Sequence, residues 1–474
     1  MTAIDVNSPK DGFARIVWTA LGGAPPALDR LRFLGEGDPC SAFAVGDLAA
    51  ASIGVAGLAI ADCVAAGQGG AAPAVEVNRR LAALWFGTDF APVGWAPPPA
   101  WDPIAGDYRT SDGWIRLHTN APHHRAAALR VLGVDGDKDA VTRAVAGWAA
   151  YALEAAVVAD GGCAAAMRDM AAWRAHANGA AVAAEPPVWF EDRAAAPVRC
   201  SAPVEGPVEP PVAGRPLAGI RVLDLTRVLA GPVATRFLAG YGADVLRIDS
   251  PWWDEPALLP GVTLGKRCAR LDLRQSRDMA VFRGLLADAD VLVHGYRPGA
   301  LARLGLHEAA RRAIRPGLID VCHDAYGWTG PWRERRGFDS LVQMSSGIAA
   351  EGMRRFGAVR PTPLPVQALD HAAGYIVAAA VARGLARRFA SGAGLAARTS
   401  LARVAALLAS GPIGAPGAGM APADAADFQT ETEATAWGPA HRMRPPVAVF
   451  GAPMRWDFPA GELGTSEAVW LPRE

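Results

Sequence analysis

The chain has 474 residues, of which 51% are hydrophobic, with 47 basic and 47 acidic residues and a formal net charge of zero. This length allows about two or three domains, each with its own core. A nucleic-acid partner is not expected, because the basic residues are dispersed and form no basic face. The cysteines are scattered without metal-ligand spacing, so neither a disulfide framework nor a metal site is expected.

The first 95 residues are expected to be a helical segment. Its most apolar stretch, 49–66, contains Ser52, Asp62 and Cys63, which argues against a membrane span. No secretory leader pattern opens the sequence, so we expect a cytoplasmic protein without a membrane partner.

Residues 96–195 are expected to form a small α+β domain. Within it, Asp107–Asn120 has the turn signal Ser111-Asp112-Gly113 between two short strand-like runs, which predicts a hairpin. The proline-rich stretch 196–216 then predicts an extended linker.

Residues 217–408 alternate between apolar strands and amphipathic helices. This alternation predicts an α/β fold with a Rossmann-like, doubly wound parallel sheet. The expected strands are Ile220–Leu225, Asp244–Ile248, Val291–His294 and Leu318–Cys322, and the expected helices are Gly231–Gly240 and Arg277–Ala287. Residues 409–474 are expected to be a C-terminal tail.

One pattern occurs twice in the chain. Val45-Gly46-Asp47 opens a long alanine-rich helix, and Ala368-Leu369-Asp370 opens another. In both copies a glycine turn then leads to a strand that runs into a helix. The sequence therefore predicts an internal duplication with Asp47 and Asp370 at equivalent positions.

Three segments could contact an anionic ligand. Ala230-Gly231-Pro232 lies between a strand and a helix, where free backbone amides can hold a phosphate. Gly265-Lys266-Arg267 places two cations at a strand edge. After the strand Val291–His294, Tyr296 could stack on adenine and Arg303 could meet a phosphate. Each segment could equally be structural.

Taken together, these segments resemble the class III CoA-transferase (CaiB/BaiF) family. The resemblance is carried, in order and spacing, by 217–232 (LAGIRVLDLTRVLAGP), Gly242-Ala243-Asp244-Val245, Gly265-Lys266-Arg267, 297–301 (RPGAL) and 327–331 (GWTGP). It implies the family III fold, acyl-CoA and carboxylate substrates without a permanently bound cofactor, and a homodimer. The residues implied to bind CoA are Val228, Leu229, Ala230, Lys266, Arg267, Gly295, Tyr296, Arg303, Leu304 and Arg336.

Asp370 matches the aspartate that attacks the acyl-CoA thioester in this family. The resemblance implies a CoA-transferase of the formyl-CoA transferase type, acting through a mixed anhydride and an aspartyl-CoA thioester. An ionised carboxylate at a helix N-terminus is a competent nucleophile. The alternative for Asp370, and equally for Asp47, is a helix N-cap.

Two other functions are weighed against CoA transfer. One is a catalytically silent protein that binds CoA or acyl-CoA. The other is an acyl-CoA isomerase or racemase, but the related racemases have a Gly-His-Asp turn where this chain has Gly337-Phe338-Asp339, so that acid/base is missing.

The first half of the chain resembles a later portion of the same family. Residues 41–190 correspond to sequence that in an ordinary member follows the Rossmann-like segment. The chain is therefore expected to be a rearranged or truncated tandem, in which the duplicated helices fill places that two chains supply in an ordinary member.

Overall fold

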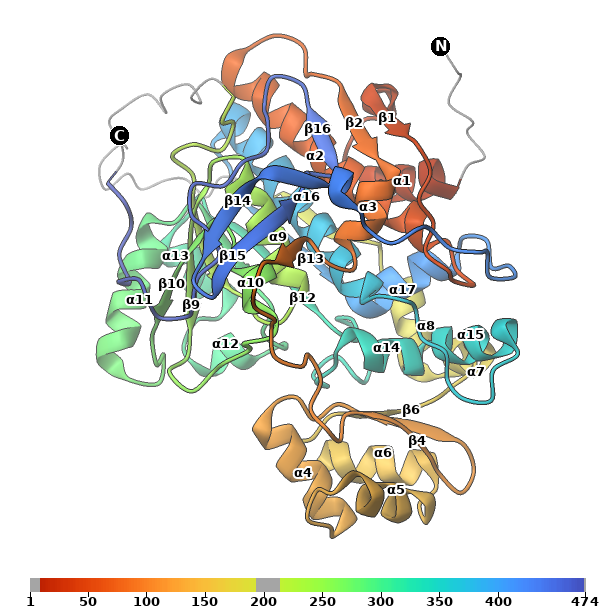
Figure 1. The fold of residues 1–474 in the computed structure, drawn as a ribbon. Helices are drawn as coiled ribbons and strands as arrows, with labels where there is room; N and C mark the ends of the chain where they lie inside the picture. Colours follow the sequence, from red (N-terminus) through yellow and green to blue (C-terminus); the bar gives the residue numbers. More distant parts are fainter. Residues whose placement is uncertain (1–8, 193–213, 473–474) are drawn as a thin grey trace.

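A seven-stranded sheet forms the core of the larger part of the protein (Figure 1). This computed structural model describes residues 9–192 and 214–472. The strand order is β10 (Lys266–Arg270), β9 (Asp244–Asp249), β8 (Arg221–Leu225), β11 (Val291–His294), β12 (Ile319–Asp324), β13 (Leu395–Ser400) and β7 (Trp189–Asp192). All neighbours are parallel except β7, which runs antiparallel to β13.

Helices cover both faces of this sheet because its strands are apolar on both sides. Val293 faces α9 (Ala230–Gly240) and α16 (Ala368–Ser391) in one core. Leu292 faces α11 (Ser276–Asp288) in another, and α13 (Glu308–Ile314) packs beside α11. The predicted doubly wound α/β fold is confirmed. The other helices of this region are α10 (Leu259–Val262), α12 (Ala300–Arg303), α14 (Asp339–Ser345), α15 (Ile348–Phe356) and α17 (Leu401–Ala409).

The duplication predicted from the sequence is present in the structure. The second copy contains α16, β13 and α17, and the first contains α2 (Val45–Gln68), β2 (Val75–Asn78) and α3 (Arg79–Trp85). The short helix has the same cap in both: Asn78 accepts from the Leu81 amide, and Ser400 accepts from the Arg403 amide. The two long helices pack against each other.

Strand pairing repeats as well. In a three-stranded sheet, β2 pairs parallel with β1 (Leu31–Leu34) and antiparallel with β16 (Val447–Val449). This is the arrangement of β12, β13 and β7 in the large sheet. The two halves exchange these antiparallel strands: β7 precedes the second copy in the sequence, whereas β16 follows it and pairs with the first.

The small α+β domain lies at one end of the molecule, at the bottom of Figure 1. Its sheet has the order β4 (Gly106–Arg109), β5 (Trp114–Leu117) and β6 (Ala164–Ala166), and the first two form the predicted hairpin. Its helices are α4 (Pro122–Leu132), α5 (Lys138–Ala146) and α6 (Ala150–Ala159).

The predicted domain limits differ from the structure in two places. The small domain was expected to reach residue 195, but its core ends at Ala164, and α7 (Met170–Ala175) and α8 (Ala177–Ala184) pack against the large part through α15 and α17. Residues 409–474 are not a tail. They include η2 (Ala425–Asp427), β14 (Phe428–Thr435) and β15 (Gly438–Met443), and β15 pairs with β3 (Phe90–Pro92). Most of the predicted linker 196–216 lies outside the described residues.

The N-terminal part is not purely helical, since it contributes β1, β2 and β3 besides α1 (Pro9–Ala20) and η1 (Pro25–Arg30). Helix α2 is long and apolar enough to cross a membrane by length and composition, but 89% of its most apolar window is buried inside the protein. Its position against α16 is that of a core helix.

Candidate active site

A cavity of about 450 Å³ lies where the carboxyl ends of β8, β9, β11 and β12 meet the small domain. The strand order reverses between β8 and β11, and ligands of doubly wound sheets bind at such a switch point. Helix α4 of the small domain contributes His123 and His124 to the wall. Of the residues predicted from the sequence, the cavity brings together Val228, Leu229, Ala230, Gly295, Tyr296, Arg336 and Asp370.

The loop between β8 and α9 forms one wall of this cavity. Val228 has a φ of 66°, a left-handed conformation that a β-branched residue rarely adopts. Its amide donates to Glu255 Oε2 at 2.9 Å. The loop is therefore held in a strained shape, with the first turn of α9 facing the cavity.

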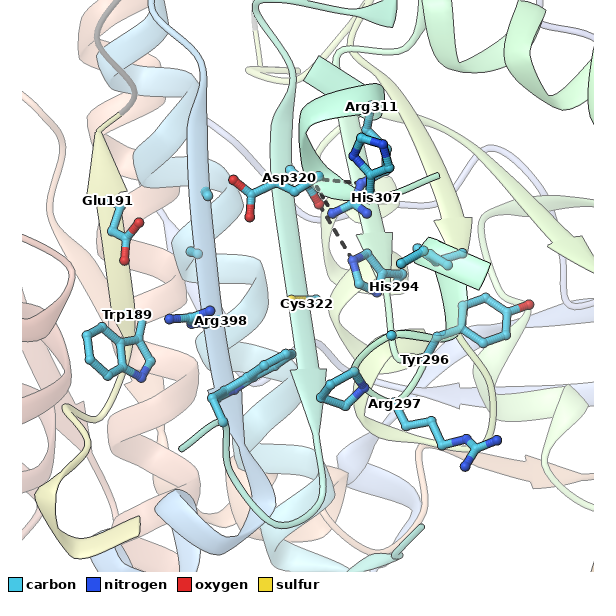
Figure 2. A pocket seen from close by; sticks show the side chains of 18 residues that line it. Trp189, Glu191, His294, Tyr296, Arg297, His307, Arg311, Asp320, Cys322 and Arg398 are labelled. Carbon is cyan, nitrogen blue, oxygen red and sulfur yellow. Dashed lines mark hydrogen bonds and ion pairs between the residues drawn. The ribbon is translucent and has the colours of Figure 1, made fainter. Parts of the chain in front are cut away.

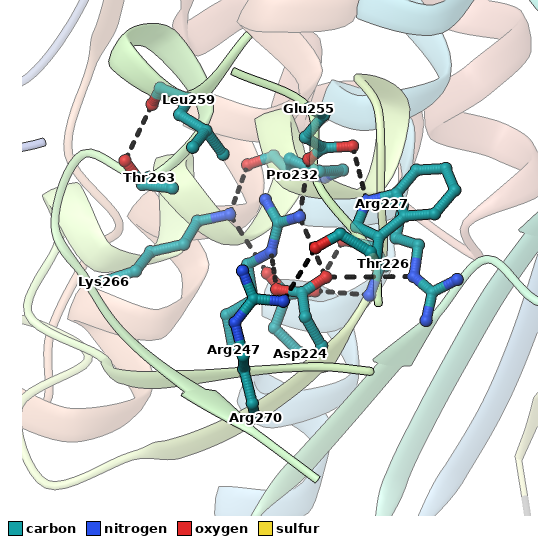
Figure 3. A network of polar contacts seen from close by, with 12 residues as sticks. Asp224, Thr226, Arg227, Pro232, Arg247, Glu255, Leu259, Thr263, Lys266 and Arg270 are labelled. Atoms are coloured by element: carbon teal, nitrogen blue, oxygen red, sulfur yellow. Dashed lines mark hydrogen bonds and ion pairs between the residues drawn. The ribbon is translucent and has the colours of Figure 1, made fainter. Parts of the chain in front are cut away.

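Lys266 was expected to contact CoA, but the structure places it beneath this loop. Its Nζ lies 3.0 Å from Asp224 Oδ2 and donates to the Pro232 carbonyl (Figure 3). The ammonium and carboxylate groups are both fully buried. Lys266 therefore holds the loop in place from below, and its side chain is not part of the cavity lining.

The buried network continues from Lys266 to the loop (Figure 3). Asp224 accepts from the amide and hydroxyl of Thr226 at 2.8 and 2.5 Å. Arg247 donates to Glu255 at 2.5 Å, and Glu255 in turn holds Val228. Burial opposes ionisation of Asp224, but Lys266 and Arg247 outweigh it and lower the pKa of that carboxyl.

Three other predicted CoA residues do not reach the cavity. Arg267 lies away from the cavity, where it donates to the Asp244 carboxylate at 2.9 Å and to the Val469 carbonyl at 2.7 Å. Arg303 is exposed on α12, and Leu304 ends that helix without lining the cavity. Both residues lie at the end of the one-turn helix α12, outside the cavity lining, and the spacing of the sequence motifs did not predict this position.

Two arginines that were not predicted lie in the cavity wall. Arg227 stacks on Trp253 and on Tyr296, with its guanidinium carbon 4.6 and 5.5 Å from the ring centroids. Arg297 follows β11; burial and the charges of Arg336 and Arg303 lower its pKa. Both arginines lie in the loops that follow a strand, Arg227 after β8 and Arg297 after β11, and this position is the signal that could have found them. The cavity is thus cationic and partly aromatic, as a nucleotide with several phosphates requires.

The glycine at position 295 has a structural explanation. A Cβ there would lie 2.6 Å from His323 Cε1, so only glycine leaves room for the imidazole. Neither ring nitrogen of His323 has a hydrogen-bond partner among the described residues, and burial lowers its pKa to about 4. His323 and the neighbouring Asp324 both line the cavity and were not predicted as site residues.

Asp370 is not a helix cap. Helix α16 begins at Ala368 after Gln367, and no side chain caps it directly. Instead, Asp339 Oδ2 accepts the amides of Leu369 and Asp370 at 2.8 and 2.9 Å. Within the described residues the Asp370 carboxylate has no hydrogen-bond or ion-pair partner of its own, and it lies in the cavity wall.

Two adjacent carboxyl groups therefore meet at the start of α16. Burial raises the pKa of Asp339 to about 6, while the amides of Asp370 and Leu369 and the Gln343 side chain oppose the rise. Burial and the charge of Asp339 together raise the pKa of Asp370 well above its usual range. Asp370 is thus the later of the two to ionise.

Phe338, which the sequence comparison set against the histidine of the racemases, packs between two histidines of the small domain. Its ring stacks on His118 at 3.7 Å between centroids and meets the edge of His124 at 5.8 Å. Burial lowers the pKa of His124 to about 3, and neither of its ring nitrogens has a hydrogen-bond partner among the described residues.

Asp47, the twin of Asp370, has a different environment. Its Oδ1 lies 2.7 Å from Nη1 of Arg79, which also binds Asp38. The equivalent position of Arg79 in the second copy is Leu401, so no cation of this kind reaches Asp370. Asp47 is engaged in a structural ion pair.

Comparison with known proteins gives a consistent result. The model of CoA-transferase family III matches residues 217–450. The acetyl-coenzyme A transferase nodX of Hypoxylon pulicicidum is 34% identical over 210 residues, 43% of this chain and 33% of that protein. The succinyl-CoA:glutarate CoA-transferase of Mus musculus is 33% identical over 195 residues, 38% of this chain and 44% of that protein. The match thus spans less than half of each relative.

Two solved structures match part of the chain. The CAIB/BAIF family protein of Brucella suis is 26% identical, with a TM-score of 0.38, 48% of this chain covered and 65% of that chain. The M. tuberculosis protein Rv3272 is 28% identical, with a TM-score of 0.38 and 42% and 59% covered. Through residues 217–450, the chain belongs to CoA-transferase family III.

Proposed function

We propose that this protein transfers coenzyme A from an acyl-CoA to a carboxylic acid, with Asp370 as the nucleophile. The observation that carries the proposal is the position of Asp370: its carboxylate lies in the wall of the cationic cavity and caps no helix. The relatives named above are CoA-transferases, which supports the reaction class.

The proposed reaction has two exchange steps. The ionised Asp370 carboxylate attacks the thioester carbonyl, forming a mixed anhydride and releasing the CoA thiolate. The thiolate attacks the aspartyl carbonyl of the anhydride, which frees the donor acid and leaves an aspartyl-CoA thioester. The acceptor carboxylate repeats these steps in reverse order, so Asp370 is regenerated. A formyl-CoA transferase-like choice of substrates is the subtype implied by the sequence resemblance.

The cavity walls fit the parts of CoA. Arg227, Arg297 and Arg336 offer guanidinium groups to the phosphates. Tyr296, Trp252 and Trp253 offer aromatic faces to the adenine. The strained Val228 loop points the amides of the α9 N-terminus at the same space.

One chain supplies both the large-domain and small-domain walls of this cavity. We therefore propose that a single chain forms a complete site, with the strand exchange replacing contacts that two subunits make in an ordinary member. A homodimer, which the resemblance implies, would add a second identical site. The proposed location is the cytoplasm.

The decisive test is mass spectrometry of the protein incubated with a panel of acyl-CoAs. We expect a covalent adduct on the peptide containing Asp370, released by hydroxylamine, and no adduct in Asp370→Asn. Full exchange activity in Asp370→Asn would contradict the proposal. Calorimetric binding of CoA without exchange or adduct would instead identify a silent CoA-binding protein.

A second candidate is proton exchange at the acyl α-carbon. Burial and Asp339 raise the pKa of Asp370, and a raised pKa suits a general acid. The neutral imidazole of His124 lies in the same cavity and suits a general base. Incorporation of deuterium at the α-carbon of an acyl-CoA in D₂O, lost in Asp370→Asn, would support it. CoA exchange without deuterium incorporation would exclude it.

A further inference from the structure

A second cavity, of about 340 Å³, lies on the opposite face of the large sheet from α16. Its floor is built by strand register. His294, Cys322, Arg398 and Trp189 are direct neighbours across β11, β12, β13 and β7, so their side chains form one row on one face (Figure 2). The small side chains of Cys322 and Ala396 leave the hollow between the imidazole and the guanidinium.

Arg398 forms one end of the hollow. Its guanidinium carbon lies 5.0 Å from the ring centroid of Trp189 and 5.4 Å from that of Trp328. No carboxylate among the described residues pairs with it, and its Nε has no hydrogen-bond partner there. An arginine stacked between two indoles, with no carboxylate paired to it among the described residues, is preorganised to bind an anion.

His294 forms the other end. The residue is 7% exposed, and neither ring nitrogen has a hydrogen-bond partner among the described residues. Asp320 Oδ1 lies 3.7 Å from Nε2, beyond hydrogen-bond distance, and Asp320 is bound by Arg311 at 2.7 Å. Burial and the charge of Arg311 lower the pKa of His294, so the ring is neutral and offers one donor and one acceptor.

The distance between the two ends sets the size of the ligand. His294 and Arg398 lie two strands apart, which corresponds to a backbone separation of roughly 10 Å. Trp328, Pro298 and Leu301 provide apolar walls between them. Three carboxylates also line the cavity: Glu191 and Glu308 are exposed to solvent, which screens their charge, and the buried Asp320 is paired with Arg311.

We propose that this cavity binds a small carboxylic acid that carries a hydroxyl group at the end opposite its carboxylate. The carboxylate binds Arg398, the flat or aliphatic body lies over Cys322 and Ala396, and the hydroxyl hydrogen-bonds to His294. Tyr296 and Arg297 line both this cavity and the one containing Asp370. The loop after β11 thus separates two ligand sites.

The test is calorimetric titration of the full chain with 4-hydroxybenzoate, benzoate and 4-hydroxybenzamide. We expect 4-hydroxybenzoate to bind best and benzoate to bind more weakly because it lacks the hydroxyl. The neutral 4-hydroxybenzamide should bind at least roughly tenfold more weakly than 4-hydroxybenzoate. Arg398→Gln should weaken 4-hydroxybenzoate binding roughly tenfold. Arg312→Gln, an exposed arginine on α13, is the matched control and should leave binding unchanged.

Two further variants locate the site. His294→Leu should remove the advantage of 4-hydroxybenzoate over benzoate, and Arg336→Gln, in the other cavity, should retain binding. Absence of binding to the wild-type chain, equal binding of the acid and the amide, or loss of binding in Arg336→Gln but not in Arg398→Gln would each overturn the proposal. Thermal melting checks that the His294→Leu variant folds. If it does not fold, the Arg398→Gln variant still tests the proposal.

Discussion

Asp339 accepts the backbone amide hydrogen of Asp370 at 2.9 Å and thereby takes the capping role expected of Asp370 itself. The start of α16 is stabilised by one carboxyl group while a second is left facing the cavity. The two groups are close enough that Asp339 is a cause of the raised pKa of Asp370. Asp339 thus stabilises the start of the helix, and the carboxyl group of Asp370 is left to face the cavity.

This division predicts a pH dependence. Asp370 must be ionised to act as a nucleophile, and its raised pKa keeps it protonated at acidic pH, so exchange activity should rise with increasing pH. Asp339→Asn removes the neighbouring negative charge and should lower the pKa of Asp370. We expect the acid limb of the kcat/KM profile to move to lower pH in this variant. An unshifted limb would show that the pair is not coupled in this way.

The two copies of the duplicated helix should respond differently to the same substitution. Asp370→Asn should abolish exchange, with a loss of at least about a thousandfold, because no other group provides the nucleophile. Asp47→Asn should leave kcat within about twofold and cost about 1–3 kcal/mol of stability, since it weakens a partly buried contact with Arg79. Exchange assays and urea denaturation of both variants check this; an equal loss of activity in both would refute the assignment.

Lys266 should matter for stability more than for direct binding. Lys266→Met leaves the fully buried Asp224 carboxylate without its ammonium partner. We expect a loss of about 3–5 kcal/mol in the free energy of unfolding, measured in urea. Lys138→Met, the same substitution at an exposed site in the small domain, should change it by less than about 0.5 kcal/mol. Similar values for both would mean that the Lys266 pair contributes little.

The contact between α16 and α9 can be tested at a glycine. A Cβ on Gly374 would lie 2.4 Å from the Ala230 carbonyl oxygen and 2.9 Å from Val233 Cβ. Gly374→Ala should therefore push the helices apart, destabilise the protein by about 1–3 kcal/mol and raise the KM for acyl-CoA, because Ala230 lines the cavity. Gly12→Ala, in α1 with no atom near the added Cβ, should instead stabilise by about 0.5–1 kcal/mol. A stabilised Gly374→Ala variant would contradict the packing.

Much of the large domain could be predicted from the sequence. Strands such as Val291–His294 are short apolar runs with clear turn signals, and the structure has this strand at the same bounds. The position of Asp370 in the cavity followed from the motif order. The prediction that Lys266 and Arg267 contact CoA placed them at the wrong end of a strand: they open β10, whereas the cavity lies at the carboxyl ends of the strands.

Other features depend on contacts distant in sequence. β16 was missed because Val447–Val449 is too short to stand out, and its strand character comes from pairing with β2, far earlier in the chain. Asp339 as the acceptor for the α16 amides was missed for the same reason. Arg227 and Arg297 follow two expected strands, but the pairing of β8 with β11, which brings both arginines to one cavity, is a contact between distant parts of the sequence.

The reciprocal placement of β7 and β16 has a consequence for how this chain can be divided. Separate polypeptides ending at Asp192 and beginning at Gly214 would each lack the edge strand that completes their own sheet, and each would carry the strand that the other needs. Neither fragment should be an autonomous folding unit, yet a mixture should reassemble by mutual complementation. Each half of the chain thus depends on a strand of the other to complete its sheet.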